Sequence, residues 1–313
     1  MVRVLEAVPN FSEGRDLSKV RALVDTIAAT GVEVLDWSAD PDHHRSVISY
    51  IGDPDLVVRA SIAAAEFARD HIDLREHQGV HPRVGALDVM PLVPLHGVDM
   101  VDAVSAAHRV GMAIADLGVP VFYYGYASDS GRRGLDELRR GGFESLAGGF
   151  PKDRRPQVPA SAERPHATAG VTCVGARRVL LAWNVFVSGI SRDQAREIAS
   201  QVRERDGGFP GLRALALHLA SQDRVQISMN LEDPAETPPL TVFSAIEKAA
   251  RARGGDVVET QVIGMIPDAL VLPAAQDRLL ILDLQPARVL SHRVRIHVEG
   301  HQDTRTPTSD DTI

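Results

Sequence analysis

The sequence predicts an α+β protein built from two similar units, because the same order of strands and helices occurs twice along it. Short apolar or alternating runs indicate strands, and apolar residues three or four positions apart indicate helices. The first predicted helix shows helical spacing at Leu17, Val20, Leu23, Val24 and Ile27. A chain of 313 residues is also long enough for about two domains.

The first unit has the order strand, helix, strand, strand, helix, strand. These elements are predicted at residues 2–8, 17–29, 32–37, 46–52, 53–70 and 84–93. Asp53 and Pro54 mark the start of the second helix, because aspartate is a favoured N-cap and proline is tolerated at the first helical position. This order is that of the ferredoxin-like unit. A helix near residues 100–117 and a strand at residues 119–124 extend it.

The second half of the chain repeats this order. Its elements are predicted at residues 178–187, 191–206, 214–219, 224–231, 240–253 and 257–263. We therefore place the N-terminal subdomain at residues 1–177, the C-terminal subdomain at residues 178–300 and a polar tail at residues 301–313. We expect residues 125–169 to form a long connector with a short helix near residues 135–140. Residues 268–292 are expected to be mostly helical.

Charge and composition weigh against several classes of protein. The formal net charge is −8, whereas a nucleic-acid-binding surface is usually basic, so we expect no nucleic-acid partner. No apolar run approaches the roughly 20 residues that span a bilayer, so we expect no membrane association. Cys173 is the single cysteine, which excludes an intramolecular disulfide and fits a cytoplasmic protein.

Two polar segments, residues 40–45 and residues 77–83, are the main candidates for a functional site. Each lies between predicted strands, and the scaffold could bring them together. His81 is the sharper candidate because an ordinary histidine pKa of about 6.5 allows it to accept and return a proton near neutral pH. Pro82 holds the backbone of His81 in an extended conformation. The alternative is that both segments are solvated turns.

A metal site competes with this interpretation. His77 and His81 are four residues apart, and residues 40–44 contain further potential ligands. On a helix that spacing would align the two imidazoles, but Gly79 and Pro82 argue against a helix here. The His-Glu-x-x-His pattern is absent as well, so we expect no metal. We interpret Cys173 as a small packed residue rather than a nucleophile.

Six motifs, in order along nearly the whole chain, resemble the formiminotransferase domain family. They are VPNFSEGR at residues 8–15, DPDHHRSV at 40–47, HPRVGALDV at 81–89, VPV at 119–121, GVTCVGARR at 170–178 and QISMNL at 226–231. The resemblance implies two ferredoxin-like subdomains, a folate groove between them and a homodimer. It also implies transfer of a formimino group from N-formimino-L-glutamate to N5 of tetrahydrofolate, the co-substrate, in one-carbon metabolism and histidine degradation.

The resemblance places the catalytic acid–base on His81. It places the folate-contacting, or cofactor-binding, segment on His166, Thr168, Ala169 and Gly170. Both substrates carry carboxylates, which arginines near the site could bind. The predicted substrate-binding set is Asn10, Asp40, Arg45, Arg83, Asp88 and Asn184.

Three departures from the family pattern leave the donor open. RPQVP replaces Pro-Asp-Phe-Gly-Pro at residues 155–159, WNVF replaces Phe-Asn-x-Asn at residues 183–186, and YGY replaces Tyr-Gly-Glu at residues 124–126. One alternative is a related formyl-group transferase that uses formylglutamate or 5-formyltetrahydrofolate. The other is a non-catalytic folate-binding protein.

Overall fold

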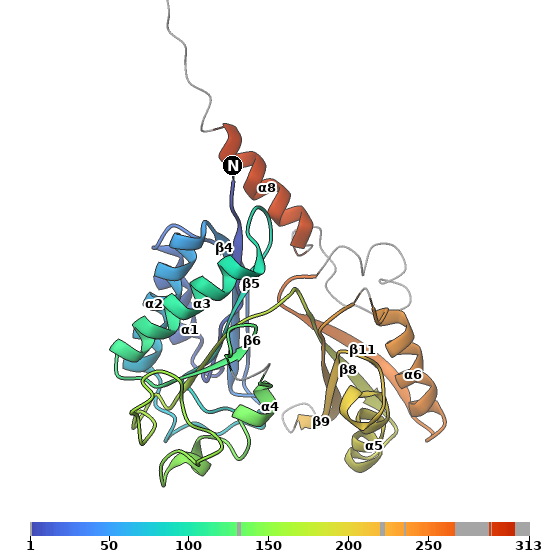
Figure 1. The fold of residues 1–313 in the computed structure, drawn as a ribbon. Helices are drawn as coiled ribbons and strands as arrows, with labels where there is room; N and C mark the ends of the chain where they lie inside the picture. The colour runs from blue at the N-terminus through green and yellow to red at the C-terminus, as the bar shows by residue number, and fades with distance from the viewer. Residues whose placement is uncertain are drawn as a thin grey trace, which may run out of the picture.

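Two β-sheets, each covered by helices on one face, form the fold in a computed structural model of the chain (Figure 1). The structure describes residues 2–129, 133–219, 223–234, 236–266, 288 and 290–303. We call the part up to β7 the N-terminal lobe and the part from β8 to β11 the C-terminal lobe. Figure 1 shows α1, α2 and α3 on the outer side of one sheet and α5 and α6 on the outer side of the other. The opposite faces of the two sheets, which we call helix-free because none of these five helices covers them, are turned toward each other (Figure 1).

The N-terminal lobe contains most of the described elements. They are β1 (Leu5–Ala7), β2 (Asn10–Phe11), α1 (Leu17–Ala28), β3 (Glu33–Asp40), β4 (Arg45–Gly52), α2 (Pro54–His71), β5 (Leu87–Pro94), α3 (Met100–Asp116), β6 (Val121–Gly125), α4 (Leu135–Leu138), the 3-10 helix η1 (Phe143–Leu146) and β7 (Thr172–Ala176).

The seven-stranded sheet of this lobe has β1 and β2 in one interrupted line between β4 and β5. Asn10 in β2 is paired with Val47 in β4 and Val89 in β5. The line breaks near Pro9, which has no N–H to donate. β3 pairs with β4 on one side, and β7 and then β6 extend the sheet beyond β5 in parallel.

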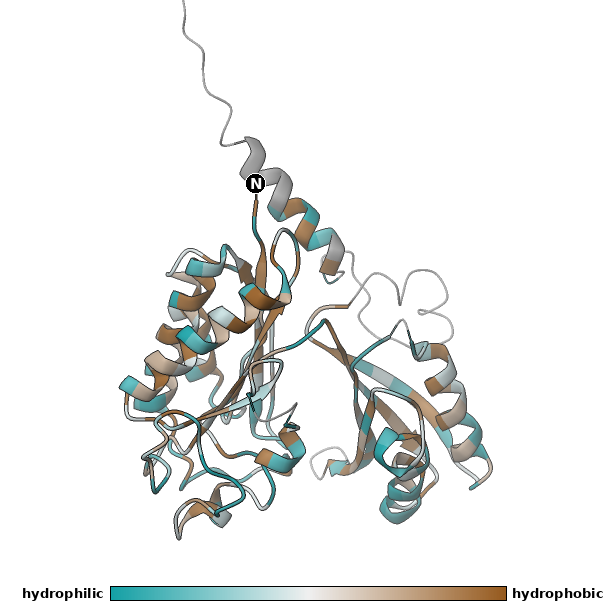
Figure 2. Cartoon of the chain, in the orientation of Figure 1, coloured by the Kyte–Doolittle hydropathy of each residue, from teal (hydrophilic) through white to brown (hydrophobic). Residues whose placement is uncertain are grey.

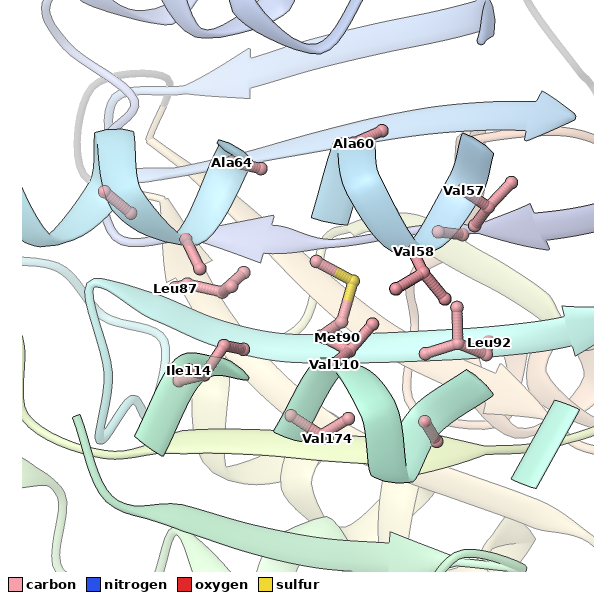
Figure 3. Packing of buried hydrophobic residues seen from close by; sticks show 14 of the residues in the cluster. Val57, Val58, Ala60, Ala64, Leu87, Met90, Leu92, Val110, Ile114 and Val174 are labelled. Atoms are coloured by element: carbon pink, nitrogen blue, oxygen red, sulfur yellow. The ribbon is translucent and has the colours of Figure 1, made fainter. Parts of the chain in front are cut away.

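The main core lies between this sheet and helices α1, α2 and α3. Figure 3 shows Met90 and Leu92 of β5 packed among Val58 of α2 and Val110 of α3. All four side chains are buried. Figure 2 shows the apolar residues gathered in the strands and on the sheet-facing sides of the helices, as expected for amphipathic elements.

The helix-free face of the same sheet is partly covered by the connector. Leu138, Leu146 and Phe150 of the connector form a second apolar cluster with residues that include Phe122 and Cys173. Cys173 is fully buried, and burial raises the pKa of its thiol. The prediction that Cys173 is a packed residue is confirmed, and the connector holds part of its own length against the sheet.

The C-terminal lobe repeats the pattern on a smaller scale. It contains β8 (Leu181–Ser188), α5 (Arg192–Val202), the 3-10 helix η2 (Glu204–Asp206), β9 (Leu212–Leu219), β10 (Arg224–Leu231), α6 (Pro239–Arg251) and β11 (Asp256–Ile263), and α8 (Leu290–Asp303) follows. The strand order is β11-β8-β10-β9, with antiparallel pairing throughout. Trp183 of β8 and Phe243 of α6 stack in its core.

Several predicted boundaries differ from the structure. The strand predicted at residues 2–8 is limited to β1, and β2 and β7 were not predicted as strands. The helix predicted at residues 191–206 ends at Val202 because Arg203 is extended. Of the helical segment predicted at residues 268–292, residues 268–287 and 289 lie outside the described part. Residues 301–303 of the predicted tail belong to α8, and residues 304–313 lie outside the described part.

Candidate functional site

The two polar segments meet beside the N-terminal sheet, as predicted. The backbone N–H of Val80 donates to the carbonyl of Asp42 at 3.1 Å. The rings of His44 and His77 stack with centroids 4.3 Å apart, and the rings of His43 and His81 lie 6.1 Å apart.

Gly79 explains how closely the two segments approach. A Cβ atom at this position would lie 2.2 Å from the carbonyl oxygen of His43, so any other residue would push the segments apart. His44 adopts a left-handed conformation with φ of 48° in the turn between β3 and β4. Because it has no side chain, Gly79 allows the turn at residues 40–45 to lie against the segment that carries His81.

The His81 ring is held in one tautomer by the backbone. Its Nδ1 lies 2.9 Å from the carbonyl oxygen of Pro82, which can only accept, so Nδ1 carries the hydrogen. In the neutral ring Nε2 then presents a lone pair. Burial and the positive charges of Arg45 and Arg139 hold the pKa of His81 well below its usual value of 6.5. The His81 ring is therefore neutral at physiological pH.

A buried charge network lies beside His81. Asp88 is fully buried, and its Oδ2 accepts from Nη1 of Arg45 at 2.8 Å and from Nη1 of Arg139 at 3.1 Å. Nε and Nη2 of Arg45 donate to Oδ1 of Asn10 at 3.1 and 2.8 Å. Burial alone would raise the pKa of Asp88, but the two arginines and the N–H of Val84 lower it. Asp88 therefore holds Arg45 and Arg139 in place.

Arg83 is tied into a separate network. Its Nη1 and Nη2 form a two-point ion pair with the Glu144 carboxylate at 2.7 and 2.6 Å. Its Nε donates to Nδ1 of His77 at 2.9 Å, and Nε2 of His77 donates to the carbonyl of His44. Burial lowers the pKa of His77 to about 4, so this ring stays neutral and links the two loops.

Two acidic residues near the histidines, Asp40 and Glu13, have hydrogen-bond or ion-pair partners other than His81. Asp40 accepts from the backbone N–H of His43 at 2.8 Å and lies 2.9 Å from Nδ1 of the same residue. Burial would raise the pKa of Asp40, but these contacts lower it. The carboxylate of Glu13, in the loop that precedes α1, lies against Nε2 of His44 at 3.3 Å and accepts from Lys19 at 2.9 Å. Both carboxylates therefore stabilise the loop that carries the histidines.

The segment predicted to contact folate is joined to the strand that follows His81. Backbone N–H groups of Val171 and Ala86 donate to the carbonyls of Val84 and Ala169, both at 2.9 Å. Gly170 has φ of 69°. His166 accepts from the N–H of Ala169 at 3.1 Å, and burial and the charge of Arg69 lower its pKa.

The segment that contains His166 lies near the end of α2, because the N–H of Leu74 donates to the carbonyl of Thr168 at 2.9 Å. Among the residues that the structure describes, we find no hydrogen bond from His166 to His81. Thr168 approaches the His166 ring, with its hydroxyl 3.3 Å from Nδ1.

Asn184 lies in the other lobe. Its neighbours Trp183 and Val185 belong to the core under α5 and α6, so Asn184 points to the helix-free face. Its Nδ2 donates to Oε1 of Gln261 at 3.2 Å. Asn184 is therefore on the face turned toward the N-terminal lobe (Figure 1).

Arg139 and Glu144 are the site residues that the sequence did not indicate. Both belong to the connector, one after α4 and the other in η1, in a stretch with no motif and weak periodicity. Charged residues there resemble ordinary surface residues. Their roles follow from partners far away in the sequence, Asp88 for Arg139 and Arg83 for Glu144.

Over the residues that the structure describes, no three His, Cys, Asp or Glu side chains are grouped to hold a metal ion. The helices that can be described also include none that is long and apolar enough to cross a membrane.

A neutral imidazole whose Nε2 presents a lone pair, set beside two guanidinium groups, is typical of an enzyme that moves protons on an anionic substrate. Comparison with known families then narrows the class. Residues 4–177 match the N-terminal subdomain of the formiminotransferase domain, and residues 182–297 match a second part described as formiminotransferase domain. The chain belongs to the formiminotransferase domain family, which confirms the resemblance seen in the sequence.

Individual relatives agree with this assignment. The chain is 33% identical to glutamate formimidoyltransferase of Thermoplasma acidophilum, over 93% of this chain and 97% of that one. It is 34% identical to the Streptococcus pyogenes protein of the same name, over 90% of this chain and 95% of that one. It is 36% identical to the formimidoyltransferase-cyclodeaminase of Sus scrofa, over 95% of this chain but 56% of that longer protein.

Proposed function

We propose that this chain is a glutamate formimidoyltransferase, which moves a formimino group from N-formimino-L-glutamate to N5 of tetrahydrofolate. The observation that carries the proposal is the similarity over nearly the full length of two proteins of that name. The chain also keeps a neutral imidazole where such a reaction needs a base. A formimino transferase is therefore favoured over a formyl transferase and over a non-catalytic folate-binding protein.

The chemistry that we propose uses His81 twice. N5 of tetrahydrofolate attacks the formimino carbon, a new C–N bond forms, and Nε2 of His81 accepts the N5 proton. The imidazolium then donates this proton to the glutamate nitrogen as the bond between that nitrogen and the formimino carbon breaks. His81 ends neutral, and each transfer is worth about 10²–10⁴-fold in rate.

The low pKa of His81 suits the second step. An imidazolium destabilised by burial and by the charges of Arg45 and Arg139 is a stronger acid than an ordinary one. It therefore gives its proton readily to the departing nitrogen. Arg45 owes its position to Asn10 and Asp88.

The remaining predicted residues keep their assignments as proposals. We propose that Asp40 supports the substrate-binding loop through His43, and that Arg83 does so through His77 and Glu144. Asn184 would reach the substrates from the C-terminal lobe. His166, Thr168, Ala169 and Gly170 would line the folate side, supported by the backbone bonds of this segment to residues 84–86.

We propose that both lobes are ferredoxin-like, with the folate groove between their helix-free faces. The strand orders of the two sheets and the arrangement in Figure 1 support this reading. The subdomain boundaries proposed are residues 1–177 and 178–300, followed by a polar tail. We also propose a cytoplasmic homodimer that serves histidine degradation, on the strength of the family.

The test is an assay of the purified protein with N-formimino-L-glutamate and tetrahydrofolate, after dialysis against a strong chelator. We expect 5-formiminotetrahydrofolate and free glutamate in equal amounts, at the same rate before and after chelation, since both proton transfers are assigned to His81. Loss of activity on chelation, restored by one divalent ion, would overturn the metal-free chemistry. Absence of product under all conditions would overturn the function.

A further inference from the structure

The charge network around Asp88 carries an unbalanced positive charge. One buried carboxylate is shared by two guanidinium groups, and the side chains of Arg45 and Arg139 are only 10% and 14% exposed. Separating a charge from water is costly unless an opposite charge lies nearby. The network therefore favours an anionic group from a ligand.

All three guanidinium nitrogens of two nearby arginines already have protein partners. Arg45 uses Nε, Nη1 and Nη2 in bonds to Asn10 and Asp88. Arg83 directs Nε to His77 and both terminal nitrogens to Glu144. Each of these two arginines is therefore held by protein partners through all three nitrogens, which leaves fewer N–H groups for a ligand.

Arg139 is different. Its Nη1 donates to Asp88, and its Nε makes a long contact of 3.4 Å with the carbonyl of Leu135. Among the residues that the structure describes, Nη2 has no hydrogen-bond partner. Arg139 therefore combines a fixed position with unused donors.

We propose that Arg139 binds the α-carboxylate of the formimino donor through Nη2, an inference that rests on the proposed function. Asp88 joins Arg139 to the segment that carries His81, because its Oδ1 accepts from the N–H of Val84 at 2.8 Å while its Oδ2 accepts from Arg139 at 3.1 Å. A group bound to Arg139 therefore lies near this segment. In N-formimino-L-glutamate the α-carboxylate is only a few bonds from the formimino carbon. The glutamate carboxylates of tetrahydrofolate are separated from N5 by the whole aromatic linker. Arg139 thus selects donors with an α-carboxylate.

The experiment compares two donors, N-formimino-L-glutamate and its α-amide, with two forms of the protein, the unaltered chain and Arg139→Gln. For the unaltered chain, we expect kcat/KM to fall by about 10-fold to 100-fold when the carboxylate becomes an amide. In Arg139→Gln this discrimination should largely vanish, with the KM for tetrahydrofolate changed by less than about threefold. Arg140→Gln is the matched control, because Arg140 is exposed and pairs with Asp153.

A second readout separates binding from a structural role. Removing the Arg139 charge should raise the pKa of His81, so the acid limb of kcat/KM should move to higher pH, while Arg139→Lys should leave it in place. Equal use of the two donors by the unaltered chain would overturn the inference without any variant, and so would unchanged discrimination in Arg139→Gln. Failure of the proposed function is distinct, because the unaltered chain would then form no product from either donor.

Discussion

His81 is the residue on which the chemistry depends. We expect His81→Ala to lower kcat by about 10²-fold or more, because both proton transfers lose their carrier. The free energy of unfolding should change little, since the hydrogen bond of the ring within the described part of the chain runs to the adjacent Pro82. Steady-state kinetics with denaturant unfolding checks both. His96→Ala, at an exposed histidine, is the control; normal turnover by folded His81→Ala would remove this residue from the mechanism.

The pH dependence follows from the low pKa of the same ring. The base must be neutral to accept a proton, so activity is lost only as pH falls through the pKa of His81. Because burial, Arg45 and Arg139 lower that pKa, the acid limb of kcat/KM should lie well below pH 6.5. When kcat/KM is measured between about pH 5 and 8, its value should be nearly constant toward pH 8. An acid limb at or above 6.5 would contradict this assignment.

At the residue scale, the sequence predicted those site residues that belong to short motifs. His81 could be chosen because proline follows it and because imidazole is suited to proton transfer. Arg45 and Asp88 lie in motifs and meet in the structure. Arg139 could not be chosen, because its role depends on a contact with Asp88 that the folded connector creates.

Among the elements, the connector offers a direct test at Gly170. A Cβ at this position would lie 2.1 Å from the carbonyl oxygen of Val84. With φ of 69° as well, even Gly170→Ala should destabilise the protein by roughly 1–3 kcal/mol. Chemical denaturation would measure this.

Gly148 provides the comparison within the same connector. Nothing lies within 4 Å of a Cβ built on it, so Gly148→Ala should change stability by no more than about 0.5 kcal/mol. Equal stabilities of the two variants would show that the 84–86 and 166–170 segments are not held together as described.

Most helices and strands could be predicted because their apolar spacing is regular and their ends are marked. Asp53 does cap α2, and Pro54 does occupy its first position. β7 escaped prediction because the segment contains Gly175 and is fully buried, so it lacks the alternation of a half-exposed strand. β2 is only two residues long and depends on β4 and β5 for its pairing.

At the scale of the whole molecule, the candidate site residues are distributed over both lobes. The N-terminal lobe holds His81 and both arginines beside it, while the C-terminal lobe contributes a helix-free face that carries Asn184. Asp136 in the connector lies 3.5 Å from Arg213 of β9, which links the lobes beside the helix that leads to Arg139. The repeated element order could be seen in the sequence, whereas this contact between lobes could not.

The central claim is that the transferred group is formimino rather than formyl. The most direct measurement supplies N-formimino-L-glutamate and N-formyl-L-glutamate together, in equal amounts, with tetrahydrofolate, and identifies the products by mass. We predict that 5-formiminotetrahydrofolate forms in at least about 100-fold excess, because the protonated formimino nitrogen makes its carbon the better electrophile. A product made mainly from the formyl donor would contradict this account.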